Sequence, residues 1–180
     1  KYFDMVKFMY KHDKKIELFV LDPSKDEVEQ INNFSLSNKL EILRVGYDNL
    51  EFPIQESFYE QIGLSYEISK KYFHIDYEKE KNIQLETELK KIYNIKNDYK
   101  LLHIEGSEGK FSEDQLKVFD NTDFIKIEKE TDIFNNLFYY FDLLLKAKEI
   151  HCINSAVFCL ADRVETNGKL FWHNFKNENP

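Results

Sequence analysis

A polar dipeptide, Asn154-Ser155, interrupts the apolar pattern near the carboxyl end of the chain. A short β-prone run at 149–153 precedes it, and a helical pattern at 155–164 follows it. An oxygen of either side chain can cap the helix by accepting a hydrogen bond from a first-turn N–H. The same helix end carries partial positive charge and unpaired N–H groups, which suit a phosphate. The dipeptide therefore indicates either a plain helix cap or a phosphate site.

A second phosphate-binding candidate is the segment "HIEGSEGKFSED" at 103–114. Its glycines permit a tight turn, its hydroxyl and ammonium groups can contact phosphate oxygens, and its histidine can donate a hydrogen bond. The spacing fits neither the dinucleotide-binding fingerprint nor a P-loop, so an ordinary turn with a solvated lysine is the alternative. The candidate ligands in this segment are His103, Gly106, Ser107, Gly109 and Lys110.

The segments that must position these residues alternate between strand-like and helix-like patterns. This alternation predicts an α/β fold with Rossmann-like parallel sheets and helices on both faces. Ligands of such sheets gather beyond the carboxyl ends of the strands, so we expect the two candidate segments to meet at one rim. The predicted strands are 16–21, 39–47, 99–106, 123–128, 149–153 and 168–175. The predicted helices are 2–10, one starting at a Ser24 cap, 56–64, 66–75, 77–95, 132–148 and 155–164.

Composition narrows the classes of protein. The 180 residues are 42% hydrophobic and 16% aromatic, enough to bury a core in one or two domains. The net charge of -8, with Arg44 and Arg163 as the only arginines, argues against a nucleic-acid partner. The sequence has no apolar run of the roughly 18 residues that a membrane span needs, and no signal peptide. We therefore expect a cytoplasmic protein, and because the chain starts without Met, we expect a further segment upstream.

The remaining reactive side chains form no recognisable catalytic set. Cys152 and Cys159 lack the spacing of a zinc site, so no metal is expected. His151 lies inside a strand-like run, which predicts a satisfied interior histidine, and Trp172 is predicted to be a core residue. Neither a Ser/His/Asp nor a Cys/His arrangement can be assembled, so the catalytic residues stay unassigned.

Five stretches in order resemble a family of bacterial and viral glycosyltransferase-like proteins with the GT-B fold. They are "VKFMYKHDKKIELFVL", "ILRVGY", "ESFYEQIGLSYEISKKYFHI", "KLLHIEGSEGKF" and "AKEIHCINSAVFCLADRVETNGKLFWH". The resemblance spans nearly the whole chain and rests on the ordered series rather than on one catalytic signature.

The resemblance implies transfer of a sugar from a nucleotide-diphosphate sugar to a saccharide or glycan hydroxyl, without metal or cofactor. It implies an incomplete, acceptor-side Rossmann-like domain at 1–76 and a nucleotide-sugar-binding domain at 77–180. The donor-phosphate wall would then be His103, Gly106, Ser107, Gly109, Lys110, Asn154 and Ser155. The alternative is a non-catalytic sugar- or nucleotide-binding module, or a structural interaction module.

Overall fold

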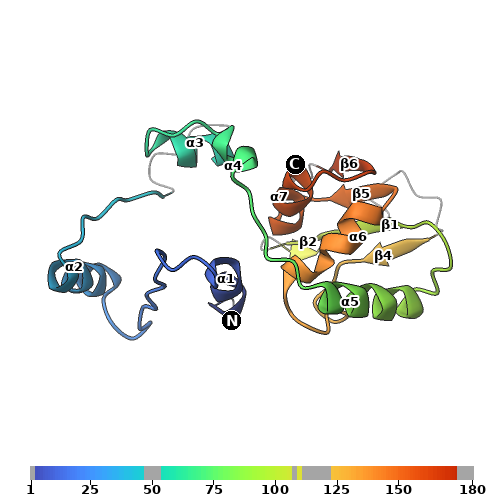
Figure 1. Ribbon diagram of the computed structural model, residues 1–180, viewed down its shortest axis with the longest axis horizontal. Coiled ribbons are helices and arrows are strands. Elements are labelled where there is room, and N and C mark those ends of the chain that lie inside the picture. The colour runs from blue at the N-terminus through green and yellow to red at the C-terminus, as the bar shows by residue number, and fades with distance from the viewer. Residues whose placement is uncertain (1–2, 47–53, 107–108, 111–122, 174–180) are drawn as a thin grey trace, which may run out of the picture. The chain divides into compact units, whose positions relative to one another are not determined.

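The computed structural model describes residues 3–46, 54–106, 109–110 and 123–173. The chain divides into two compact units, unit 1 at Lys1–His74 and unit 2 at Ile75–Pro180. Unit 2 contains all the strands that the described residues form (Figure 1).

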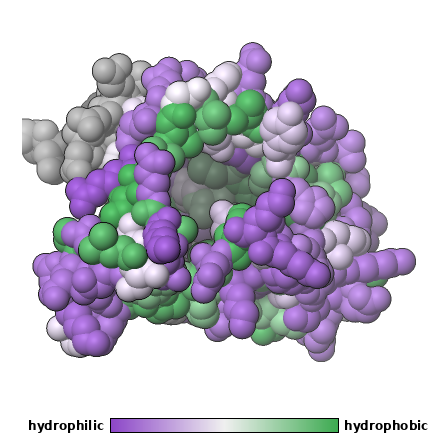
Figure 2. Space-filling model, turned by 60° about the vertical axis from the view of Figure 1, so that its left-hand side comes forward, coloured by the Kyte–Doolittle hydropathy of each residue, from purple (hydrophilic) through white to green (hydrophobic). Residues whose placement is uncertain are grey.

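The described residues of unit 1 form four helices joined by segments without regular secondary structure. It places most of its apolar side chains at the surface, and Phe8 is its only buried hydrophobic residue among those described. Figure 2 shows apolar side chains (green) between polar ones on one face of the molecule. The helices are α1 (Phe3–Tyr10), α2 (Glu27–Asn38), α3 (Ile54–Glu60) and α4 (Ile68–Lys71).

The two strands predicted in this unit are absent from its described part. Residues 16–21 and 40–46 are irregular, so the prediction of a Rossmann-like first half is wrong for the described residues. Phe19 stacks on Phe34 of α2, with ring centroids 4.2 Å apart. A β-prone run becomes a strand only when another strand pairs with its backbone, and here the run meets a helix instead.

The cap of α2 also differs from the prediction. Asp26, rather than Ser24, is the N-cap, and its carboxylate accepts a hydrogen bond from the N–H of Glu29 at 2.7 Å. Ser24 donates its hydroxyl to Asp22 instead, at 2.7 Å. The Asp26 carboxylate also suits the positive end of the helix dipole, so it is a good residue at this position.

Unit 2 is a mixed α/β unit around a four-stranded parallel sheet. The strand order is β4-β1-β5-β6, so β1 and β5 lie side by side at the centre of the sheet. A separate antiparallel pair, β2 with β3, follows β1. The strands are β1 (Lys100–His103), β2 (Glu105–Gly106), β3 (Gly109–Lys110), β4 (Phe124–Lys126), β5 (Glu149–Cys152) and β6 (Lys169–Trp172).

The helices of unit 2 cover a core centred on the sheet. α5 (Lys79–Ile92) packs against η3 (Leu137–Tyr140) and α6 (Phe141–Lys146), while α7 (Ala156–Arg163) packs against β5 and β6. The hydroxyl of Tyr99 donates to the carbonyl of Leu143 at 3.0 Å and ties the start of β1 to α6. The fully buried centre is formed by Leu85, Leu89, Leu101, Ile125, Leu143, Leu144 and Ile150.

One long helix was predicted at 132–148, but the regular part begins only at Leu137. Asp132 accepts a hydrogen bond from the N–H of Phe134, and Asn136 accepts one from the N–H of Phe138. Such local side-chain bonds compete with helical ones, so they shorten the helix despite its apolar pattern.

Candidate functional site

Several of the residues predicted to bind phosphate lie at the carboxyl rim of the parallel sheet. The chain leaves β1 for β4 on one side and later returns to β5 on the other side of β1. The connections after β1 and β5 therefore diverge, and this is the topological switch point at which open α/β sheets bind ligands. His103 ends β1 and pairs in register with Cys152, which ends β5.

Gly106 brings the two predicted segments into contact. A Cβ placed on Gly106 would lie 3.1 Å from Cδ1 of Ile153 and 4.0 Å from the carbonyl oxygen of Asn154. The N–H of Ile153 also donates to the carbonyl of His103 at 3.1 Å. The two predicted segments therefore lie together at one rim of the sheet. A residue with a side chain at position 106 would crowd this junction.

Ser155 caps α7 as predicted. Its hydroxyl accepts a hydrogen bond from the N–H of Phe158 at 3.3 Å, and its carbonyl accepts the N–H of Cys159 at 3.0 Å. Ser155 is half-buried and Asn154 is exposed. The first N–H groups of a helix have no intrahelical acceptor, so those of Ala156 and Val157 are the donors that an anion can use here.

His103 is oriented by the neighbouring strand. Its Nδ1 lies 3.0 Å from the carbonyl oxygen of Ile127, and because a carbonyl can only accept, Nδ1 carries the proton. Burial lowers the pKa of His103, so the ring is neutral at pH 7 and its Nε2 is a hydrogen-bond acceptor. This arrangement favours a role as acceptor or base over the predicted donation to a phosphate.

The described residues of the first predicted segment that follow Ile104 form the antiparallel pair of β2 and β3. Gly106 pairs with Gly109, and Glu105 pairs with Lys110. Ser107 lies outside the described residues, as does the side chain of Lys110. The predicted phosphate contacts of these two residues therefore stay predictions.

Sequence reasoning missed a histidine pair at the same rim. His151 is 1% exposed and hydrogen-bonded at both ring nitrogens, which confirms it as a satisfied interior histidine. One of its partners is His173, which was given no role. Trp172 is 55% exposed, so its prediction as a core residue is wrong, because it ends the edge strand β6. Residues 149, 151, 171 and 173 lie on the same face of two paired strands. The sequence could have indicated the histidine pair only if the register of β5 with β6 had been known.

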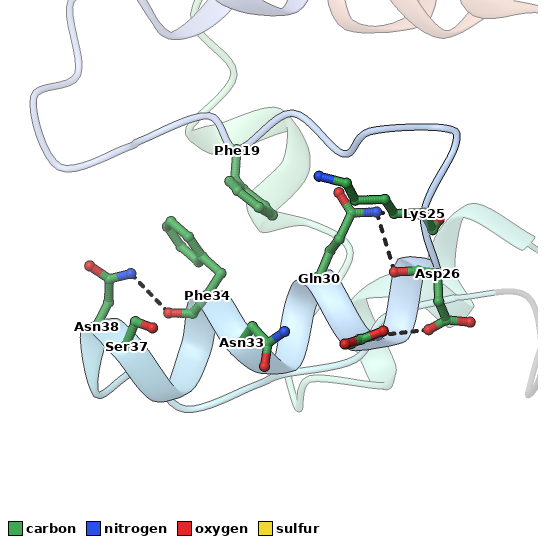
Figure 3. Close-up of a pocket in the computed structure, with 9 residues that line it drawn as sticks. Phe19, Lys25, Asp26, Gln30, Asn33, Phe34, Ser37 and Asn38 are labelled. Atoms are coloured by element: carbon green, nitrogen blue, oxygen red, sulfur yellow. Dashed lines mark hydrogen bonds between the residues drawn. The ribbon is translucent and has the colours of Figure 1, made fainter.

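Unit 1 contains a cavity of about 540 Å³ beside α2 (Figure 3). Two of the amides that line it already form hydrogen bonds, because the Gln30 amide donates to the carbonyls of Asp22 and Asp26 and the Asn38 amide donates to the carbonyl of Phe34. The Gln30 bond to Asp22 ties the segment before α2 to the helix, and because both amides are already bonded within the chain, this cavity is the weaker candidate for a ligand site.

Metal and membrane sites are not found in the part of the chain that is described. No group of three or more His, Cys, Asp or Glu side chains there could hold a metal ion. None of the helices described is both long and apolar enough to cross a bilayer.

Comparisons with protein-family models, with curated proteins and with solved structures find no match to this chain.

Proposed function

We propose that unit 2 binds the diphosphate of a nucleotide sugar at the carboxyl rim between β1 and β5, in a glycosyltransferase-like protein that uses a glycan hydroxyl as acceptor. The observation that carries this proposal is the switch point in the strand order, with the capped start of α7 beside it. The sugar-transfer part rests on the ordered resemblance of the sequence to GT-B proteins.

In this proposal, the rim stabilises the diphosphate as it leaves the sugar. When the sugar leaves, negative charge grows on the phosphate oxygen, and fixed N–H donors in place before the reaction stabilise it. The first turn of α7 supplies such donors at Ala156 and Val157, while Ser155 fixes the position of that turn. With no cation needed, this mode of binding suits an acidic chain that has only two arginines.

A charge substitution at the helix cap tests the phosphate site. Aspartate is as good an N-cap as serine, so Ser155→Asp keeps α7 folded while placing a negative charge against the diphosphate. We expect calorimetry with uridine diphosphate to show at least about a ten-fold loss of affinity, which is about 1.4 kcal/mol.

Ser155→Ala is the matched control. It removes the cap and costs about 1 kcal/mol of stability, but it adds no charge, so most of the affinity should remain. Equal affinity of Ser155→Asp and the unsubstituted chain would show that the diphosphate does not bind here.

A non-catalytic binding or interaction module is the second candidate. It is favoured by unit 1, whose described residues form no strand and expose many apolar side chains, unlike a Rossmann-like acceptor domain. Release of uridine diphosphate from a uridine-diphosphate sugar by the full chain would favour transfer. Tight binding without release would favour the module.

A further inference from the structure

The indole of Trp172 is an exposed aromatic ring at the carboxyl rim of the sheet. Trp172 is the last residue of β6 and pairs in register with Cys152, the last residue of β5. β6 is the edge strand, and no strand among the described residues pairs with its outer side. The side chain is 55% exposed, so its large flat ring is accessible to a ligand that reaches this rim.

The Trp172 ring lies on the face of the sheet that α7 covers. Its centroid is 6.0 Å from that of the Phe158 ring of α7, with the two planes 34° apart. Successive side chains of a strand point to opposite faces, so Phe171, which stacks on the buried His151, belongs to the other face. The exposed indole is therefore on the side of the sheet where α7 begins.

Phe158 links this ring to the proposed phosphate site. Its N–H donates to the Ser155 hydroxyl at 3.3 Å, so Phe158 belongs to the first turn of α7. The N–H groups proposed to bind the diphosphate, those of Ala156 and Val157, lie in the same turn and have no intrahelical acceptor. One helical turn therefore carries both the ring that meets Trp172 and the donors proposed for the diphosphate.

The spacing of these groups fits the parts of one nucleotide. Three residues connect β5 to α7, and α7 packs against β5 and β6, which lie side by side (Figure 1). Neighbouring strands are about 4.8 Å apart, so the end of β6 is one strand away from the end that leads into α7. A nucleotide has its base and its diphosphate on either side of a ribose, and it needs two adjacent sites of this kind.

We propose that Trp172 is a stacking platform for the base of a nucleotide whose diphosphate lies at the start of α7. This inference rests on the proposed function for the position of the diphosphate. Stacking removes apolar area of both rings from water and adds dispersion contacts between them. Every base has a π-face, so the platform selects nucleotides over free pyrophosphate rather than one base over another.

Intrinsic fluorescence tests the platform directly, because Trp172 is the only tryptophan of the chain. We expect uridine diphosphate to quench the emission of the full chain as it binds. Inorganic pyrophosphate, which has no base, should compete with uridine diphosphate for the start of α7 but leave the emission unchanged. Calorimetry measures the affinity of each ligand independently of the ring.

Substitutions at the rim separate stacking from a general effect on the sheet. Trp172→Leu keeps an apolar side chain on the exposed edge strand, so the fold should survive. It should weaken uridine diphosphate binding at least about five-fold, the lower end of what base stacking contributes, and leave the affinity for pyrophosphate unchanged. Trp172→Phe keeps an aromatic face and should retain most of the affinity. Phe171→Leu is the matched control, since it removes the neighbouring ring from the opposite face and should bind both ligands normally.

The outcomes distinguish this inference from the proposed function. The platform would be overturned if uridine diphosphate bound without changing the emission, bound Trp172→Leu as tightly as the unsubstituted chain, or lost as much affinity in Phe171→Leu. Pyrophosphate binding that Ser155→Asp abolishes would leave the proposed diphosphate site standing in each of these cases. Quenching by uridine diphosphate that persists in Ser155→Asp would support the platform and contradict the diphosphate site. If neither ligand bound, both proposals would fall.

Discussion

At the scale of the residue, neutral histidines in the interior decide how the protein responds to acid. Burial lowers the pKa of His103, His151 and His173 below the ordinary value of 6.5. The unfolded chain, with its ordinary histidines, then takes up protons before the folded chain does. The free energy of unfolding should therefore fall as the pH drops below about 6.5.

Urea denaturation at pH 7.5 and at pH 5.5 measures this effect. The midpoint should be lower at pH 5.5, and one fully linked proton changes the free energy of unfolding by at most about 1.4 kcal/mol per pH unit. His151→Gln removes one linked group, so its midpoint should depend less on pH, with His12→Gln in unit 1 as the matched control. A midpoint that stays constant or rises on acidification would contradict the burial of neutral rings.

The residue scale is also where the sequence is most informative about caps. Ser155 could be predicted because a cap depends only on its own helix. The bonding of His151 to His173 could not, because their contact depends on the register of β5 with β6 across 22 residues of chain. Ser24 shows the limit of the local rule, since Asp26 two residues later is the cap instead.

At the scale of the element, the start of β6 depends on a glycine that leaves no room for a side chain. A Cβ on Gly168 would lie 2.1 Å from the carbonyl oxygen of Ala147 and 2.7 Å from that of Lys148. Both neighbours are backbone atoms, so neither can rotate away. The N–H of the next residue, Lys169, donates a hydrogen bond to the carbonyl of Lys148 at 3.0 Å, and this bond begins the β5–β6 pairing.

Gly168→Ala should therefore displace β6 from β5. We expect a loss of about 1–3 kcal/mol in the free energy of unfolding, typical of overpacking at a fixed contact. Gly46→Ala is the control, because a Cβ there meets nothing within 4 Å. Equal stability of both variants, measured by urea denaturation, would show that β6 does not approach β5 this closely.

Strands were predicted correctly where a β-prone sequence run also has a neighbouring strand to pair with. Strands β1, β4 and β5 were predicted because a buried parallel strand is a short apolar run between turn residues, and the largely exposed edge strand β6 was predicted from the apolar run at 168–175. Runs 16–21 and 39–47 have the same local character, but the described residues of unit 1 offer them no pairing strand. The β2–β3 hairpin was anticipated only as a glycine-containing turn, since each of its strands is two residues long.

At the scale of the whole molecule, the two units differ in how much apolar surface they bury. Unit 2 has a continuous core around its sheet, whereas unit 1, as far as it is described, buries Phe8 alone among its hydrophobic residues. A parallel sheet could be predicted from the alternation of the elements, whereas its switch point depends on the strand order β4-β1-β5-β6, which the structure gives and which places the proposed site in unit 2. In unit 1 the four described helices were predicted close to where they lie, but the two predicted strands are not formed by its described residues.

The central claim is that a nucleoside diphosphate binds at the rim between β1 and β5. Its most direct test is an amide nitrogen–proton NMR titration of the full chain with uridine diphosphate. The account predicts that the largest shifts fall on residues 104–106 and 153–158, with those of unit 1 unmoved. Shifts centred on α2 and its cavity, or no shifts at saturating ligand, would contradict it.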